Sequence, residues 1–318
     1  MVASAGDSRL ATHELLRTHK QAGLLRSEVE GRWARICDRV WQHKGVSLLS
    51  TPDLCAADKD QIRLALDALI GVEVHLVVTM DTFSQQIYGS WLAELRGGGT
   101  TGWEKYAARV LSPAHDHRQA ERFWAGHDLP AILNRWGWTF HPQRLHVVAS
   151  PDVRQHWPEL LEIAGLPELG SAAVLPPYAD PAGLAVLRKV NLHLDERLVG
   201  GSVGLLTALD HEGAAMPVRC TIALKPLVER WTDTLAGSGH DLRGDLALLV
   251  DEGRETALPG PRNQLNAAVD ALAEALAENT RLRALASDLE SETDRLDRKR
   301  RKLKRRLKRQ RREGSPEN

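Results

Sequence analysis

One polar stretch of the chain gathers histidines, the side chains that metal ions use most often. It contains His115, Asp116 and His117, and His127 follows within the next turns of the chain. Two histidines at i and i+2 in a loop lack the fixed third ligand that a zinc site requires. We therefore interpret these residues as a loop cluster, and we predict no metal site among the thirteen histidines.

Glycine and cysteine patterns give no reactive site either. Glycines 97–99 form a run, but no suitable strand and lysine flank it as in a phosphate loop, so the run favours a hinge. Cys37, Cys55 and Cys220 are far apart and odd in number. They match no metal motif, and we expect buried thiols of a reducing compartment.

The distribution of charge is strongly asymmetric although the net charge is zero. Residues 298–312 hold 12 basic residues and no acidic one, so the first 297 residues carry 30 basic and 40 acidic residues. Such a basic tail can bind a polyanion, whether nucleic acid, anionic lipid or an acidic glycan. The alternative is a solvated tail, or one that folds back on the acidic body. No aromatic residue is interleaved, so base stacking is not expected.

Composition and length place the chain among globular proteins. Of the 318 residues, 42% are apolar, which excludes disorder along the whole chain and allows one large domain or two. No apolar run reaches the ~20 residues that span a bilayer. The first residues show no apolar core behind a basic start, so no secretory signal is expected. We expect a cytoplasmic protein without a transmembrane segment.

Short apolar segments alternate with helical ones, which predicts an α/β fold with a mainly parallel sheet. The expected strands are residues 46–50, 72–79 and 145–150. The expected helices are residues 10–44, 57–70, 82–96, 102–111, 121–136, 157–164 and 181–198. Ligands of such sheets bind beyond the carboxyl ends of the strands, here residues 50–53, 79–82 and 150–153. Trp124, Trp136 and Trp138 fall on apolar positions and are expected in the core.

A long helix is expected from about Pro261. Leu282, Leu289, Leu296 and Leu303 recur every seven residues, which is the pattern of a coiled-coil seam. The intervening seam positions include Ala286, Thr293 and Arg300, so a single charged helix packed on its own domain is the alternative. The expected division is an α/β domain over residues 1–260, the helix over 261–312 and a disordered tail over 313–318.

Four segments, in their order and spacing, carry a resemblance to a known family. They read VEVHLVVTMDTFSQQIYGSWLAEL, FWAGHDLPAILNRWGWTFHPQRLHVVASP, LAVLRKVNLHL and ERWTDTLAGSGHDLRGDLALL. In this order they resemble the actinobacterial sulfotransferase-like family of the P-loop fold, over about residues 12 to 250. The resemblance implies a P-loop-type, mainly parallel sheet flanked by helices.

The resemblance also implies a cofactor and its contacts. Such enzymes transfer a sulfuryl group from 3′-phosphoadenosine 5′-phosphosulfate to a hydroxyl group, and no metal is required. Ser90 lies near the position of a serine that holds the 3′-phosphate, and Arg188, followed by Lys189, is a further candidate for binding this cofactor. The alternative is that Ser90 faces solvent or the helix backbone and that Arg188 pairs with a neighbouring acid.

Three departures from the family pattern concern this donor site. Asp81 stands where the resemblance places a phosphate-binding arginine, and a carboxylate repels a phosphate. Ser50, Thr51 and Pro52 replace a segment that would supply a His or Glu base. The phosphosulfate loop, of the form GxxKTGTT, should lie before residue 12, where nothing matches it. We expect a sheet truncated at its N-terminus, unless the true start codon lies further upstream.

Three functions therefore remain open, and the catalytic residues stay unknown. The first is sulfuryl transfer, with a donor site that this chain has lost. The second is a non-catalytic adaptor whose fold binds a partner while the C-terminal helix and tail, residues 261–312, self-associate or anchor it. The third is a protein whose basic tail mainly binds a polyanion.

Overall fold

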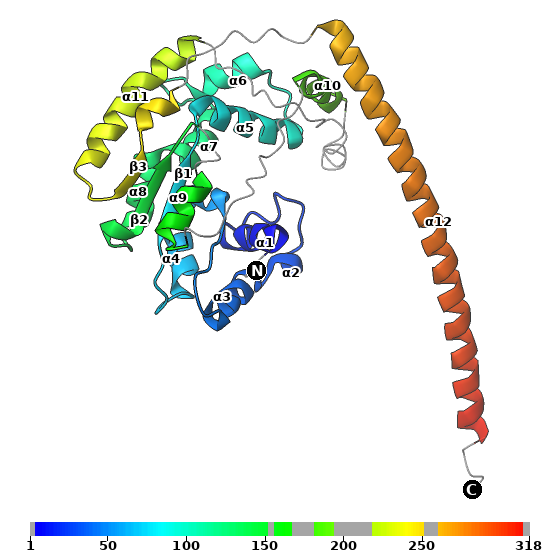
Figure 1. Cartoon of the computed structure of the whole chain (residues 1–318). Helices are drawn as coiled ribbons and strands as arrows, with labels where there is room; N and C mark the ends of the chain where they lie inside the picture. Colours follow the sequence, from blue (N-terminus) through cyan, green and yellow to red (C-terminus); the bar gives the residue numbers. More distant parts are fainter. Residues whose placement is uncertain (1–3, 152–155, 167–180, 194–217, 251–259, 314–318) are drawn as a thin grey trace.

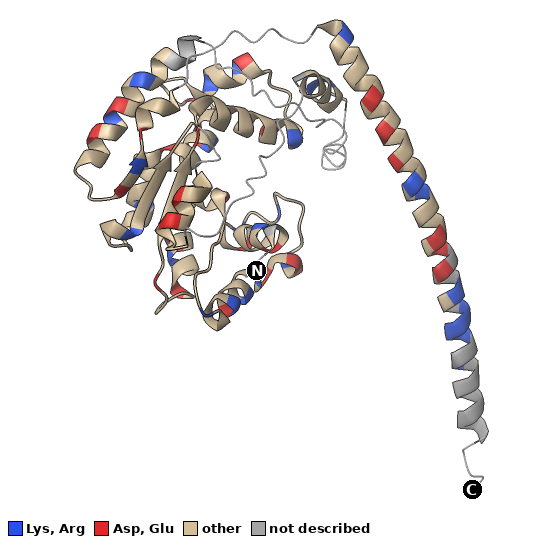
Figure 2. Ribbon diagram, in the orientation of Figure 1, with Lys and Arg blue, Asp and Glu red and all other residues tan. Residues whose placement is uncertain are grey.

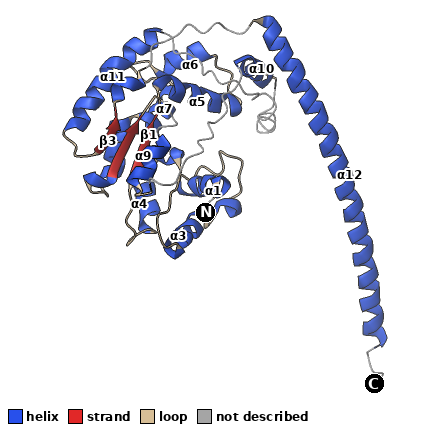
Figure 3. Cartoon of the chain, in the orientation of Figure 1, coloured by secondary structure: helices blue, strands red, loops and turns tan. Residues whose placement is uncertain are grey.

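The computed structural model describes residues 4–151, 156–166, 181–193, 218–250 and 260–313. It is a mainly helical α/β fold in which helices surround a small sheet (Figures 1 and 3). The α-helices are α1 (Ala5–Leu15), α2 (Arg26–Val29), α3 (Arg32–Gln42), α4 (Lys59–Asp67), α5 (Phe83–Arg96), α6 (Trp103–Val110), α7 (Arg118–His127), α8 (Leu129–Gly137), α9 (His156–Ile163), α10 (Pro181–Asn191), α11 (Val218–Ala236) and α12 (Pro261–Glu313). Short 3₁₀ helices are η1 (Pro52–Ala56), η2 (Pro142–Arg144) and η5 (Leu246–Leu249).

The sheet has three strands, β1 (Leu76–Met80), β2 (Leu145–Ala149) and β3 (Asp241–Gly244), in the order β1-β2-β3. Both pairs are parallel, with Leu76 opposite Leu145 and His146 opposite Asp241. All five residues of the central strand β2 are buried, which is typical of a parallel sheet covered on both faces. The predicted α/β class and parallel sheet are confirmed.

The strand predictions were partly wrong. Residues 46–50 form no strand, and the side chains of Val46 and Leu48 are almost half exposed, so this apolar run does not enter the sheet. The first strand begins at Leu76 and not at residue 72. Strand β3 was not predicted, because its four residues alternate between half-buried and exposed positions and carry two charges.

Two predicted helices are interrupted where the backbone or a cap requires it. The segment 10–44 contains the second half of α1 and all of α2 and α3, and the connections between them include Gly23 and Gly31, whose φ angles of 69° and 74° favour glycine. The segment 121–136 contains α7 and α8, because the carboxylate of Asp128 accepts the amide of Ala131 and caps α8. Helix α10 ends at Asn191, and residues 194–198 lie outside the described part of the chain.

One hydrophobic core joins the sheet to the helices around it. Trp231 of α11 packs against Phe83 of α5 at a ring distance of 5.6 Å, and Trp124 is also in contact with this pair. Trp124 and Trp136 are buried as predicted. Trp138 is 54% exposed, contrary to prediction, because it lies one residue beyond the end of α8 and no longer follows the helix's apolar face.

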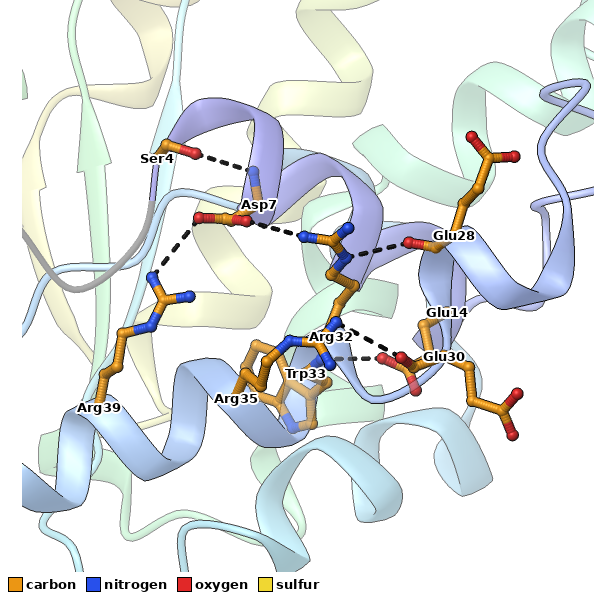
Figure 4. A network of polar contacts seen from close by, with 9 residues as sticks. All are labelled: Ser4, Asp7, Glu14, Glu28, Glu30, Arg32, Trp33, Arg35 and Arg39. Carbon is orange, nitrogen blue, oxygen red and sulfur yellow. Dashed lines mark hydrogen bonds and ion pairs between the residues drawn. The ribbon is translucent and has the colours of Figure 1, made fainter. Parts of the chain in front are cut away.

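Polar contacts hold the first three helices together (Figure 4). The carboxylate of Glu14 accepts the amides of Gly31 and Trp33, at 2.6 and 2.8 Å, and so satisfies free donors at the start of α3. Asp7 pairs with Arg32 and Arg39 at 3.3 and 3.5 Å. The turn of the chain between α1 and α3 is therefore fixed by charge as well as by packing.

Helix α12 leaves the body beside α10 and extends away from it (Figure 1). Near its start, Nζ of Lys189 donates to the side chain of Gln264 at 2.9 Å, and Ala267, Ala268 and Ala271 pack against the core. The predicted long helix is confirmed. Within the described ranges, no helix combines the length and apolar character that crossing a bilayer requires.

Candidate functional site

The carboxyl edge of the sheet brings together an acid and a histidine. Asp81 directly follows β1, and His156 opens α9, the helix after β2. Because β1 and β2 are parallel, the chain leaves both at the same edge, and the amide of Ser150 donates to the carbonyl of Met80 at 3.1 Å. Nδ1 of His156 lies 3.5 Å from Oδ1 of Asp81, an ion-pair distance.

His156 is withdrawn from water, whereas the side chain of Asp81 is 35% exposed. His156 is only 7% exposed, and within the described residues its Nε2 atom and Oδ1 of Asp81 have no hydrogen-bond partner. Burial raises the pKa of Asp81, and the neighbouring His156 opposes this effect. The 3.5 Å separation of Nδ1 from the carboxylate is that of an ion pair and not of a hydrogen bond, so a general base is one chemistry that these residue types could support and not one that this geometry builds.

Nearby hydroxyl groups serve the turn into α5. The side chain of Thr82 accepts the amide of Gln85 at 3.4 Å and caps the helix, and its hydroxyl lies 3.0 Å from that of Ser84. The side-chain amide of Gln86 donates to the backbone carbonyl of Asp81. These contacts fix the backbone that presents the Asp81 carboxylate.

A second polar cluster crosses the amino end of the sheet. The buried His146 of β2 lies between two partners, with Nδ1 at 2.7 Å from Oδ2 of Asp241 and Nε2 at 2.8 Å from Nδ1 of His75. Arg243 of β3 also donates to Asp241, at 2.9 Å, and to Glu159 of α9, at 3.0 Å. The cluster therefore joins β2, β3 and the residue that precedes β1 to α9.

The charges of this second cluster are compensated. Burial alone would raise the pKa of Asp241, but the hydrogen bonds from His146 and Arg243 outweigh burial and lower it. The hydrogen bonds of Arg243 to the carboxylates of Asp241 and Glu159 raise the pKa of Arg243. A compensated network of this kind holds β3 in the sheet, and we interpret it as structural.

The structure places the two predicted phosphate contacts on different helices. Ser90 lies on α5, and its hydroxyl is 2.8 Å from the hydroxyl of Tyr106. Arg188 is half-buried on α10, which packs against α5 through the side-chain amide of Asn191. That amide donates to the carbonyls of Leu95 and Gly99, both at 2.8 Å. A role for Ser90 and Arg188 in binding a nucleotide stays a prediction.

The histidine cluster of the sequence is engaged in packing. Nδ1 of His127 donates to the carbonyl of Phe123 at 2.7 Å, its ring stacks on that side chain, and burial lowers its pKa. His115 stacks on Trp124 at a ring distance of 5.5 Å. Across the residues that the structure describes, no group of three or more His, Cys, Asp and Glu side chains has a metal-binding arrangement.

Neither described thiol has the environment of a reactive cysteine. Cys37 is buried, and burial raises its pKa to about 11. Burial also raises the pKa of Cys55, which is half-buried. The side chain of Cys220 lies outside the described part of the structure.

Two surface hollows lie away from the Asp81–His156 pair. One, of about 490 Å³, is lined by Ile70, Val74, Phe140 and Arg144 among others, near the amino end of β1. The other, of about 330 Å³, lies between α8 and the end of α11 and shares Trp138 with the first. Both are open and shallow enough to leave Trp138 more than half exposed.

Sequence reasoning missed His156 and the histidine network. His156 follows the third predicted strand, residues 145–150, by only a few residues, so the sequence could have placed it near the carboxyl edge of the sheet. His146 alternates with apolar neighbours on β2 and carries no such signal, because its partner Asp241 is 95 residues away. Comparison of the chain with models of known families, with curated proteins and with solved structures found no match of any kind.

Proposed function

We propose that this chain is a self-associating, non-catalytic adaptor, in which α12 joins copies and the α/β body offers the binding surface. The exposed leucines of α12 carry this proposal. Six of them, between 47% and 61% exposed, lie along the helix where it extends from the body: Leu272, Leu276, Leu282, Leu285, Leu289 and Leu296.

An apolar stripe on a surface helix normally packs on its own domain. In the part of the chain that the structure describes, the contacts of α12 with α10 and the core lie in its first turns, and Ala267, Ala268 and Ala271 pack against the core. Burying one leucine side chain contributes about 2 kcal/mol, so several of them provide a strong reason for two helices to pair. The seven-residue repeat is the spacing that keeps such a seam facing a partner helix.

Sedimentation velocity tests self-association on the full chain. We expect the wild-type chain to sediment as an oligomer and Leu282→Glu/Leu289→Glu to sediment as a monomer, because each glutamate would be buried in the seam. The matched control is Ala277→Glu/Ala284→Glu, which adds the same charge on the opposite face of α12 and should leave the oligomer intact. A wild-type chain that is monomeric at all concentrations would refute the proposal.

A second candidate is sulfuryl transfer from 3′-phosphoadenosine 5′-phosphosulfate. The buried His156 at the carboxyl edge favours it, since such transfer needs a base for the acceptor hydroxyl. Asp81 at the same edge and the contact between Ser90 and Tyr106 do not fit a 3′-phosphate, which needs cations and free hydroxyls.

Calorimetry with 3′-phosphoadenosine 5′-phosphate separates the two functions. We expect no heat of binding at millimolar ligand, because Asp81 repels a phosphate. Binding at micromolar ligand would refute the adaptor proposal and support sulfuryl transfer.

A further inference from the structure

A single heptad register runs along the exposed part of α12. The a positions are Leu272, Asn279, Ala286, Thr293 and Arg300, and the d positions are Ala275, Leu282, Leu289 and Leu296. Leu272, Leu282, Leu289 and Leu296 are each about half exposed. The leucines thus share one face of the helix with Asn279, a polar residue that coiled coils accommodate at an a position, and with one cation, Arg300.

The two ends of this helix have opposite charge. Residues 265–297 contain eight acidic and three basic residues, whereas residues 298–312 contain 12 basic residues and no acidic one. Figure 2 shows acidic residues along the upper and middle part of α12 and basic residues farther along. A parallel, in-register pair would set the basic segment of one copy beside that of the other, and like charges repel. An antiparallel pair separates the two basic segments to opposite ends.

We infer that α12 pairs with α12 of a second copy in antiparallel orientation, centred between Ser287 and Asp288. The inference rests on the proposed self-association and adds its orientation and register. In this register Ala286 of one copy faces Leu289 of the other, and Leu282 faces Thr293. Arg300 faces Ala275, so no two cations share a layer of the seam.

The charges beside the seam select this register. Glu278 of each copy lies at a g position opposite Lys299 of the other, and Arg283 lies at an e position opposite Glu290. Both contacts are attractive, and such flanking pairs set orientation in coiled coils. A parallel pair would instead place Lys299 of one copy against Lys304 of the other, and Arg300 of one copy against Arg300 of the other.

Neighbouring antiparallel registers are disfavoured by the same side chains. A shift of one heptad in one direction places Glu292 opposite Glu292 of the second copy. A shift in the other direction places Arg283 opposite Arg283. The register centred between Ser287 and Asp288 avoids both repulsions.

Disulfide cross-linking under a thiol redox buffer tests the orientation. Full-length Leu282→Cys and Thr293→Cys chains, one of them carrying a mass tag, are oxidised separately and as a mixture, with the wild-type chain as the control for native thiols. We expect a mixed Leu282→Cys/Thr293→Cys dimer and little self-linking of either variant. Efficient self-linking of Leu282→Cys alone, as a parallel pair would give, would overturn the inference.

Sedimentation of the same variants separates this inference from the proposed function. If the chains are monomeric, self-association itself fails. If they are dimeric but form no mixed disulfide, the antiparallel register fails and self-association stands. Dimers that form the mixed disulfide support both.

A charge exchange gives an independent measurement. Lys299→Glu should weaken the dimer roughly tenfold, because two attractive contacts become repulsive in each dimer. The double variant Glu278→Lys/Lys299→Glu should recover part of the lost affinity, because it restores the attraction between the copies but replaces the pairing of Glu278 with Arg281 on its own helix by a repulsion. Arg301→Glu, which makes the same change of charge on the outer face, is the matched control, and equal effects of Lys299→Glu and Arg301→Glu would contradict the register.

Discussion

At the scale of single residues, two carboxylates of the sheet have opposite electrostatic environments. Among the described residues, Asp81 at the carboxyl edge lies at an ion-pair distance from His156, and burial raises the pKa of Asp81. Asp241 at the amino end accepts hydrogen bonds from His146 and Arg243, which together lower its pKa. The ionised carboxylate of Asp81 therefore lowers the free energy of unfolding, and the ionised carboxylate of Asp241 raises it.

This contrast predicts opposite effects of two isosteric substitutions at neutral pH. Asp81→Asn should raise the free energy of unfolding by up to about 1 kcal/mol, because a partly solvated, half-buried charge is removed. Asp241→Asn should lower it by up to about 1 kcal/mol, because the hydrogen bonds from His146 and Arg243 lose their charged acceptor at a side chain that solvent partly screens. Urea denaturation of the two variants and the wild-type chain at pH 7 measures both.

The pH dependence gives the control. A raised folded-state pKa means that the cost of Asp81 is present above that pKa and disappears as pH falls toward the ordinary carboxyl range, so the advantage of Asp81→Asn should shrink toward pH 4. A lowered folded-state pKa means that the stabilisation by Asp241 persists to more acidic pH. The stability that Asp241→Asn loses relative to the wild-type chain should therefore disappear only below pH 4. Parallel curves for both variants would contradict the assignment.

At the scale of elements, the sheet depends on one close contact of backbone with backbone. Gly244 ends β3 with a φ angle of 89°, and a Cβ atom there would collide with the carbonyl oxygen of Ala149 in β2. Only glycine meets both conditions. The pairing of β3 with β2 in turn places Asp241 beside His146.

Gly244→Ala should therefore destabilise the protein by roughly 2–3 kcal/mol, because it combines backbone strain with a clash. Gly237→Ala is the matched control, since a Cβ atom at Gly237 meets no atom within 4 Å. We expect that control to stay within about 0.5 kcal/mol of the wild-type chain. Thermal unfolding of the two variants measures the difference, and similar melting temperatures would show that β3 does not depend on this approach.

At the scale of the whole molecule, an acidic body is joined to a helix that ends in a basic segment. The first 297 residues carry ten more acidic than basic residues, and residues 298–312 carry 12 basic residues. The antiparallel pair inferred for α12 would present one such segment at each end. A polyanion is the partner that this charge predicts.

The basic segment should determine the affinity for heparin. We expect a chain ending at Asp297 to bind heparin about a hundredfold more weakly than the full chain, and the affinity of the full chain to fall linearly with salt on logarithmic scales. A chain ending at Arg312, which lacks only the last six residues, is the control and should bind as the full chain does. If the chain ending at Asp297 keeps the full affinity for heparin, the prediction that the basic segment binds a polyanion is wrong.

Local pattern was sufficient for several elements of this fold. The strands that became β1 and β2, the helices α5, α6 and α9, and the start of α12 at Pro261 follow from apolar periodicity and flanking glycine or proline. The seven-residue repeat of leucines also needs no structure to be seen, because it lies within one helix.

Only the tertiary structure could decide the remaining features, because they depend on residues distant in the chain. Strand β3 is short and charged, and it is a strand because β2 offers it an edge. Trp138 lies on the surface because α8 ends just before it. The approach of His156 to Asp81, across 75 residues, follows from two parallel strands that end at one edge. The sequence by itself determined the fold class and the charged leucine-bearing helix, since both are written in local periodicity. Which side chains meet at each edge of the sheet was decided by strand pairing, a long-range choice that local propensity does not encode.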